Sequence, residues 1–75
     1  MMSYTLNSMV LLQYCAAEAG FKPVWPHESE IMERLKASRL VEQRADGVWV
    51  ANAAGKRALE LLRLKPLEQP WIARS

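Results

Sequence analysis

The sequence predicts a small α+β domain in which two helices are followed by a β-hairpin and a third helix. Three observations support this prediction: an amphipathic segment that begins at Glu28, an Asp46-Gly47 pair between two β-prone runs, and the helix-opening run Asn52-Ala53-Ala54-Gly55. Asp-Gly between such runs is a strong short-range hairpin signal. The chain has 75 residues and is expected to form one domain over residues 1–75, because a chain of this size has only one small core.

The first predicted helix begins at Asn7 or Ser8, either of which can cap it, and runs to about Ala19. Gly20 supplies the left-handed residue that commonly ends a helix. The polar positions of this segment are few, namely Asn7, Gln13 and Glu18. Its apolar surface is wider than one core-facing stripe requires. The helix is therefore either the centre of the fold or the seam of a dimer.

Residues 21–26 contain two prolines, which exclude a regular helix interior and predict an extended connector. We expect this connector to carry Phe21, Val24 and Trp25 inward. The second helix begins after residue 26 or 27 and ends near residue 38. Its core face consists of Ile31, Met32 and Leu35.

The hairpin is predicted from strands over residues 40–44 and 48–51, joined by residues 45–47, with Trp49 as its large apolar anchor. Asn52 is a suitable cap for the third helix, and Pro66 ends that helix. One side of the helix is traced by Ala54, Ala58, Leu61, Leu62 and Lys65. Residues 66–75 form a short tail. We expect its Trp71 and Ile72 to dock onto the domain or a neighbouring subunit, since aromatic anchors concentrate interface energy.

Several runs follow one another in a characteristic order: Ile31-Met32-Glu33-Arg34-Leu35, Leu40-Val41-Glu42-Gln43-Arg44, Asp46-Gly47, Trp49 and Asn52-Ala53-Ala54-Gly55-Lys56-Arg57-Ala58. They resemble the second half of winged-helix regulators of the multiple-antibiotic-resistance (MarR-like) type. In that family a recognition helix precedes a Gly-Leu-Val-x-Arg strand, a wing and a Leu-Thr-x-Ala-Gly-Arg helix start. The resemblance covers about half of the chain. It implies a winged-helix-like domain with residues 28–38 as the recognition helix and 45–47 as the wing tip.

The chain departs from that family at three places. Arg39 stands where the family has glycine before the strand, and a left-handed turn there would cost a non-glycine residue roughly 1 kcal/mol. Asn52 replaces a threonine, which exchanges one helix cap for another. The family also places a complete helix before the recognition helix, whereas this chain has only the connector 21–26. The helix-turn-helix is therefore expected to be abbreviated.

The sequence leaves two functions open with equal weight. The first is a small regulatory protein that binds double-stranded DNA through Arg34, Lys36, Arg39 and Arg44. The second is a protein-interaction module, such as a small inhibitor or adaptor encoded by a phage or another mobile element, that uses the same scaffold without DNA contact. Its partner would meet Glu28, Glu30, Glu33, Trp71 and Ile72. The net charge of +2 is mild for a protein that relies on phosphate contacts, and the early carboxylates would be repelled by DNA.

No catalytic constellation is predicted, because His27 is the only histidine and Cys15 the only cysteine. We expect that the protein is not an enzyme and that it binds no cofactor or metal. Cys15 lies among apolar residues without a nearby positive charge, so we expect a buried thiol in a reducing, cytoplasmic setting. No run approaches the roughly 20 apolar residues that span a bilayer. The hydrophobic content of 51% predicts apolar surface that a homodimer would cover.

Overall fold

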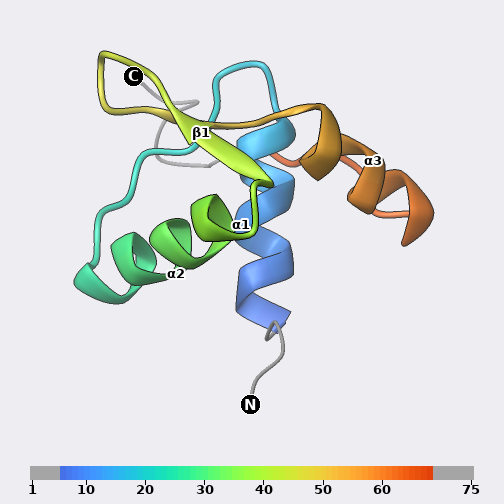
Figure 1. Ribbon diagram of the computed structural model, residues 1–75, viewed down its shortest axis with the longest axis horizontal. Helices are drawn as coiled ribbons and strands as arrows, with labels where there is room; N and C mark the ends of the chain where they lie inside the picture. The colour runs from blue at the N-terminus through green and yellow to red at the C-terminus, as the bar shows by residue number, and fades with distance from the viewer. Residues whose placement is uncertain (1–5, 69–75) are drawn as a thin grey trace.

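The computed structural model describes residues 6–68, and Trp71 and Ile72 of the predicted tail lie outside this range. Its elements are α1 (Leu6–Ala16), α2 (Pro26–Ala37), β1 (Val41–Gln43), β2 (Trp49–Ala51) and α3 (Ala53–Leu61). The predicted order α-α-β-β-α and the small α+β architecture are confirmed. Figure 1 shows α1 at the middle of the molecule, α2 and α3 on either side of it, and the hairpin across one end.

Helix α1 is the centre of the fold. Leu11, Leu12 and Cys15 are buried, and the helix packs against α2, α3 and β2. A helix that is apolar nearly all round needs neighbours on several sides, and three elements supply them. The rest of the buried core consists of Phe21, Met32, Leu35, Val41, Trp49, Ala51 and Leu59. Of the two sequence-based interpretations of α1, the structure bears out the central helix.

Helix α1 ends earlier than the sequence predicted, at Ala16 rather than near residue 19. The Ala17 N–H donates to the Tyr14 carbonyl at 3.1 Å and the Gly20 N–H to the Ala17 carbonyl at 3.0 Å. Both hydrogen bonds span three residues, which tightens the chain beyond an α-helix. Gly20 has φ +78 and is the predicted left-handed residue. The helix begins at residue 6, so the predicted capping positions 7 and 8 lie inside it.

Phe21 joins the connector to the hairpin. Its N–H donates to the Trp49 carbonyl and its carbonyl accepts from the Trp49 N–H, both at 2.8 Å. The connector thereby adds a one-residue antiparallel bridge to β2. The Phe21 ring is fully buried and stacks on Tyr14, with ring centroids 5.8 Å apart. The inward position predicted for Phe21 is confirmed.

The inward positions predicted for Val24 and Trp25 are wrong. Their side chains are 58% and 60% exposed. Their backbone N–H groups face the domain instead, because both donate to Oε1 of Glu28, at 2.8 Å and 3.0 Å. The side chains therefore project into solvent at the start of α2.

The Asp46-Gly47 pair makes the predicted hairpin turn. Strands β1 and β2 are antiparallel, and Glu42 pairs with Val50 at the centre of the register. Gly47 adopts φ +89, and its N–H donates to the Arg44 carbonyl at 2.9 Å. Each strand is three residues long, which is shorter than predicted. The turn chemistry fixes the reversal, while the short pairing leaves residues 44–48 as a loop.

Helix α3 begins as predicted and ends early. The side chain of Asn52 caps it by accepting from the Gly55 N–H at 2.8 Å. The helix ends at Leu61, and Arg63 follows in a left-handed conformation with φ 59. The Leu64 N–H then donates to the Leu59 carbonyl at 2.9 Å, which is the hydrogen bond of a Schellman cap. This cap stops the helix before Pro66 is reached.

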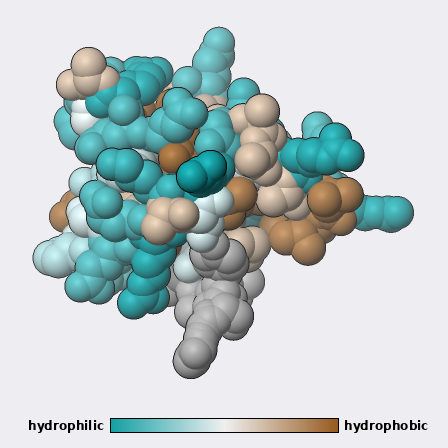
Figure 2. All heavy atoms as spheres, in the orientation of Figure 1, coloured by the Kyte–Doolittle hydropathy of each residue, from teal (hydrophilic) through white to brown (hydrophobic). Residues whose placement is uncertain are grey.

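Exposed leucines gather at the end of α3. Leu61 and Leu62 are 75% and 56% exposed. In Figure 2 brown spheres cluster on the right-hand side, where Figure 1 places α3, while hydrophilic residues cover much of the left. Exposed apolar surface thus lies at the end of α3 as well as at Val24 and Trp25.

The buried thiol of Cys15 gives a direct test of the core. Burial raises the pKa of Cys15 from 9.0 to about 12, and its Sγ lies 3.6 Å from Sδ of Met32. Since the thiolate is the reactive form, the thiol of the folded protein should react with an aromatic disulfide at pH 8 at least roughly a thousandfold more slowly than that of the unfolded chain, three pKa units corresponding to that factor. The two rates are compared in buffer and in denaturant, and rapid labelling in buffer would contradict the buried position.

Candidate nucleic-acid interface

A groove of about 520 Å³ lies where the end of α2, strand β1 and the start of α3 meet. Its lining combines two cations, a carboxylate, two amides and one apolar residue, in order Lys36, Arg39, Glu42, Gln43, Asn52 and Val41. Amide and cationic groups are the donors that bind phosphate and sugar oxygens of nucleic acid. The groove is open to solvent, so an extended polyanion can reach it.

The backbone at Arg39 is fixed by the way α2 ends. Arg39 has φ 63, and its N–H donates to the Lys36 carbonyl at 2.9 Å. The Leu40 N–H reaches back to the Leu35 carbonyl at 3.0 Å, which completes a Schellman cap. The left-handed turn that the family pattern implied is therefore present without glycine. A non-glycine residue there costs roughly 1 kcal/mol.

Asn52 ties the end of α2 to the start of α3. Its side-chain Nδ2 donates to the Arg39 carbonyl at 2.8 Å, and its backbone N–H donates to the Leu40 carbonyl at 3.1 Å. Gly55 allows this approach, because a Cβ at that position would collide with the Leu40 carbonyl oxygen. The end of α2, which carries both groove cations, and the start of α3 are thus held in one arrangement.

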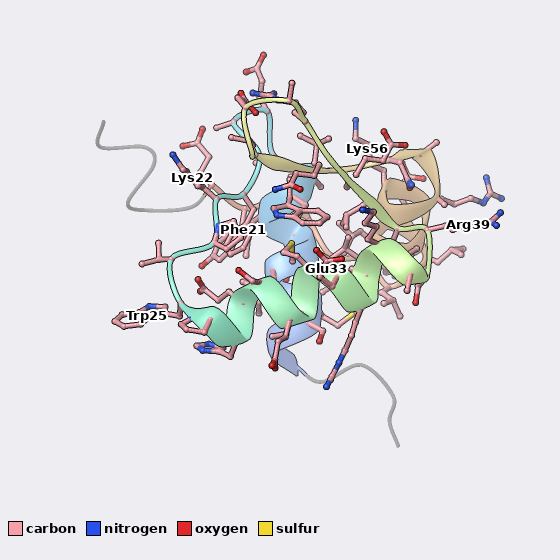
Figure 3. The ribbon with its side chains drawn as sticks, turned by 60° about the vertical axis from the view of Figure 1, so that its left-hand side comes forward. Phe21, Lys22, Trp25, Glu33, Arg39 and Lys56 are labelled. Atoms are coloured by element: carbon pink, nitrogen blue, oxygen red, sulfur yellow. The ribbon has the colours of Figure 1, made fainter. Side chains whose placement is uncertain are left out.

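The structure brings together two of the four cations predicted to bind nucleic acid. Lys36 and Arg39 flank the groove, and within residues 6–68 neither forms an ion pair. Figure 3 shows Arg39 projecting from the end of α2 into solvent. Arg34 lies two residues from Lys36 on the helix, a spacing that points the two side chains to different faces. This two-residue spacing within the predicted helix was the signal that could have separated Arg34 from Lys36.

Arg44, the fourth predicted cation, sits at the hairpin turn and is already paired. Its Nη2 lies 2.7 Å from Oδ2 of Asp46. Its charge is therefore partly neutralised before any ligand arrives, although the pair is exposed and screened by solvent. Arg44 stays outside the groove.

The three carboxylates predicted to meet a protein partner separate in the structure. Glu28 is only 7% exposed, and its Oε1 is occupied by the Val24 and Trp25 N–H groups, so it does not belong to an exposed acidic patch. The physical reason is that Glu28, at the third position of α2, reaches back to the N–H of the N-cap residue Trp25, as in a capping box. Glu30 and Glu33 are exposed on α2.

Besides Val41, three polar groove residues were not predicted from the sequence. Glu42 and Gln43 belong to a strand that was read only for its hairpin pairing, and Asn52 was read only as a helix cap. Lys56 lies in the first turn of α3, where its backbone N–H donates to the Asn52 carbonyl at 2.9 Å, and it is not one of the residues that line the groove. Figure 3 shows Lys56 and Arg39 on the same side of the molecule. The spacing of polar residues gave no sign that these elements would meet.

The Asp46 carboxylate gives a test of the hairpin turn. Hydrogen bonds from Arg44 and from the Val48 N–H lower the pKa of Asp46 from 3.8 to about 2. Because the folded pKa is lowered, the stabilisation is complete above pH 3.8 and is lost as the pH falls toward about 2. We expect the Val48 amide signal to titrate with an apparent pKa near 2 in an NMR experiment. In Arg44→Ala it should move toward 3.8; an unchanged value there would contradict the pairing.

Comparisons with protein-family models, with curated proteins and with solved structures give no match for this chain. Within residues 6–68, no three His, Cys, Asp or Glu side chains gather in a way that could hold a metal ion. None of the helices in that range is both long and apolar enough to cross a membrane.

Proposed function

We propose that this protein is a small regulator that binds double-stranded DNA through the groove between α2, β1 and α3. The observation that carries this proposal is the pair Lys36 and Arg39, two cations without ion-pair partners in the described part of the chain, which line a groove of about 520 Å³. Gln43 and Asn52 add amide groups beside them. Such a set suits the sugar-phosphate backbone, which supplies most of the affinity in non-specific complexes.

The arrangement supports an abbreviated winged helix in which α2 occupies the place of a recognition helix. Phe21 bridges to β2 in place of a complete preceding helix. The contact with DNA is then made by the end of α2. The exposed carboxylates Glu30 and Glu33 would oppose phosphates along the earlier part of the helix. The left-handed turn at Arg39 fixes the backbone at the end of α2, where Lys36 and Arg39 lie.

A salt titration with a random 20-base-pair duplex, followed by fluorescence anisotropy, tests the proposal. Each phosphate contact contributes about −0.9 to the slope of log affinity against log salt. With Lys36 and Arg39 in contact, we expect a slope of about −2. Binding that is absent at low salt, or a slope near zero, would refute DNA as the ligand.

Glu42 allows a more specific version of this test. Its carboxylate lines the groove and opposes any phosphate there. Glu42→Gln keeps the side chain's size and removes the charge, so DNA affinity at low salt should rise about two- to fivefold, the usual range for an exposed charge interaction. Glu18→Gln, which neutralises an exposed carboxylate beyond the end of α1 and outside the groove lining, serves as the control. An equal rise in both variants would mean that net charge alone, and not the groove, sets the affinity.

We further propose that the chain forms a homodimer through the end of α3. Leu61 and Leu62 form the apolar centre of this surface, and Arg57 and Glu60 lie exposed on the same helix with opposite charges. A two-fold related copy presents the same patch in reverse, so that Arg57 of one copy can approach Glu60 of the other. Light scattering after size-exclusion chromatography should give the mass of a dimer for the native chain and of a monomer for Leu61→Ser.

A further inference from the structure

Val24 and Trp25 form an exposed apolar pair at the opposite end of α2 from the groove. Both side chains are more than half exposed, and Figure 3 shows Trp25 projecting away from the domain at the start of α2. Isolated exposed apolar residues are ordinary on protein surfaces. An exposed tryptophan beside a second apolar residue is different, because tryptophan is enriched among the residues that contribute most to interface affinity.

The backbone that carries this pair is held rigidly. One buried carboxylate oxygen, Oε1 of Glu28, accepts from both the Val24 and the Trp25 N–H. Pro23 and Pro26 flank the pair and restrict the backbone further. A partner that binds Trp25 therefore does not have to order this segment first, and preorganisation of this kind raises affinity.

The charge on the first turns of α2 favours one class of partner over another. Between Pro23 and Glu33 the chain has three glutamates and no lysine or arginine, and two of these glutamates, Glu30 and Glu33, are exposed. The two groove cations lie at the other end of α2, which has 12 residues and is therefore about 18 Å long. A polyanion is repelled from the first turns of α2, whereas a basic segment is attracted to them.

We propose that Val24, Trp25, Glu30 and Glu33 form a protein-docking surface, called here the Trp25 surface, that takes a basic amphipathic segment of a partner. An apolar side chain of that segment covers Trp25, and its lysines or arginines approach Glu30 and Glu33. Because the groove lies at the far end of α2, one molecule can hold DNA and the partner segment at the same time. The proposal goes beyond DNA binding and does not depend on it.

Two helical peptides of 14 residues test the Trp25 surface, one built from leucine and lysine and one from leucine and glutamate in the same pattern. Each is added to the full-length protein while amide and indole signals are followed by NMR. We expect the leucine-lysine peptide to shift the signals of residues 24–33, including the Trp25 indole, and the leucine-glutamate peptide to leave them in place. Trp25→Ser should weaken binding at least tenfold, and Leu67→Ser, which removes an exposed apolar side chain outside both the dimer surface and the Trp25 surface, should not.

Two variants of Glu28 test whether binding needs the hydrogen bonds that fix the Val24 and Trp25 backbone, in addition to the two side chains. Glu28→Gln keeps an acceptor oxygen for the two N–H groups and should bind the leucine-lysine peptide as the native chain does. Glu28→Ala removes that oxygen and should weaken binding while Val24 and Trp25 are both still present. The proposal is overturned if both peptides shift the signals equally, if neither does, or if Trp25→Ser binds unchanged. Shifts of residues 24–33 caused by the random DNA duplex would assign the surface to nucleic acid instead.

Discussion

Replacing Gly20 with alanine is expected to destabilise the domain by about 2–5 kcal/mol. Gly20 adopts φ +78, and a left-handed conformation costs an alanine about 1–2 kcal/mol. The new Cβ would also lie 2.5 Å from Cγ1 of Val48 and 2.8 Å from the Trp49 carbonyl oxygen. That oxygen cannot retreat freely, because it accepts the Phe21 N–H. Overpacking of this kind adds about 1–3 kcal/mol.

A loss of this size would remove a large part of the domain's free energy of unfolding. A domain of 75 residues has a free energy of unfolding of only about 4–11 kcal/mol at the usual value per residue. Urea unfolding followed by circular dichroism measures the difference, and the alanine variant should unfold at a much lower urea concentration or be largely unfolded in buffer.

Gly47→Ala is the matched control for this prediction. Gly47 has a similar φ of +89, but a Cβ there would meet no atom within 4 Å. This variant carries the backbone cost alone, about 1–2 kcal/mol, so the difference between the two variants isolates the contact with Val48 and Trp49. Equal losses in the two variants would show that the connector does not press against the hairpin at Gly20.

The elements that local chemistry specifies were predictable from the sequence. Asp46-Gly47 turns the chain because glycine adopts the positive φ at low cost, and Asn52 caps α3 because its side chain reaches a free amide. Gly20 ends the turn after α1 for the same reason as Gly47, because it also adopts a positive φ. Each of these signals acts within four residues and needs no tertiary contact.

The features that depend on distant segments were not predictable. An extended connector can turn either side inward, and the outcome for Val24 and Trp25 is decided by the buried carboxylate of Glu28 and by the bridge from Phe21 to Trp49. The end of α3 was missed because its left-handed residue is Arg63 and not glycine. The next residue, Leu64, packs against the core, so tertiary packing overrode the local preference at that position.

The candidate site shows the same division. Lys36 and Arg39 could be selected from the sequence as free cations near the end of a helix. Their grouping with Gln43 and Asn52 could not, because it depends on how β1 and α3 return to that helix. Arg44 illustrates the reverse error, since a cation two residues from an aspartate pairs with it across the turn. Charge in a sequence is therefore a poor guide to charge that is available to a ligand.

Replacing Arg39 with glycine is expected to weaken DNA binding while stabilising the fold. Glycine adopts the left-handed conformation of Arg39, φ 63, without the penalty of a side chain, and the free energy of unfolding should rise by up to about 1 kcal/mol. The guanidinium is lost from the groove at the same time. The salt slope should therefore fall by about 1, and by about 2 when Lys36→Gln is combined with it. Anisotropy at several salt concentrations and urea unfolding measure the two effects separately.

Arg63→Gly provides the control that separates position from charge. Arg63 is left-handed with φ 59, is exposed and lies outside the groove lining. The two substitutions remove the same charge and relieve the same backbone conformation, so both should stabilise the fold equally, and only Arg39→Gly should change the DNA slope. If both variants bind DNA equally well, the groove is not the interface. If Arg39→Gly binds DNA weakly and is also less stable than the native chain, Arg39 has a structural role. The weaker binding is then not assigned to the loss of the guanidinium, and the prediction is wrong.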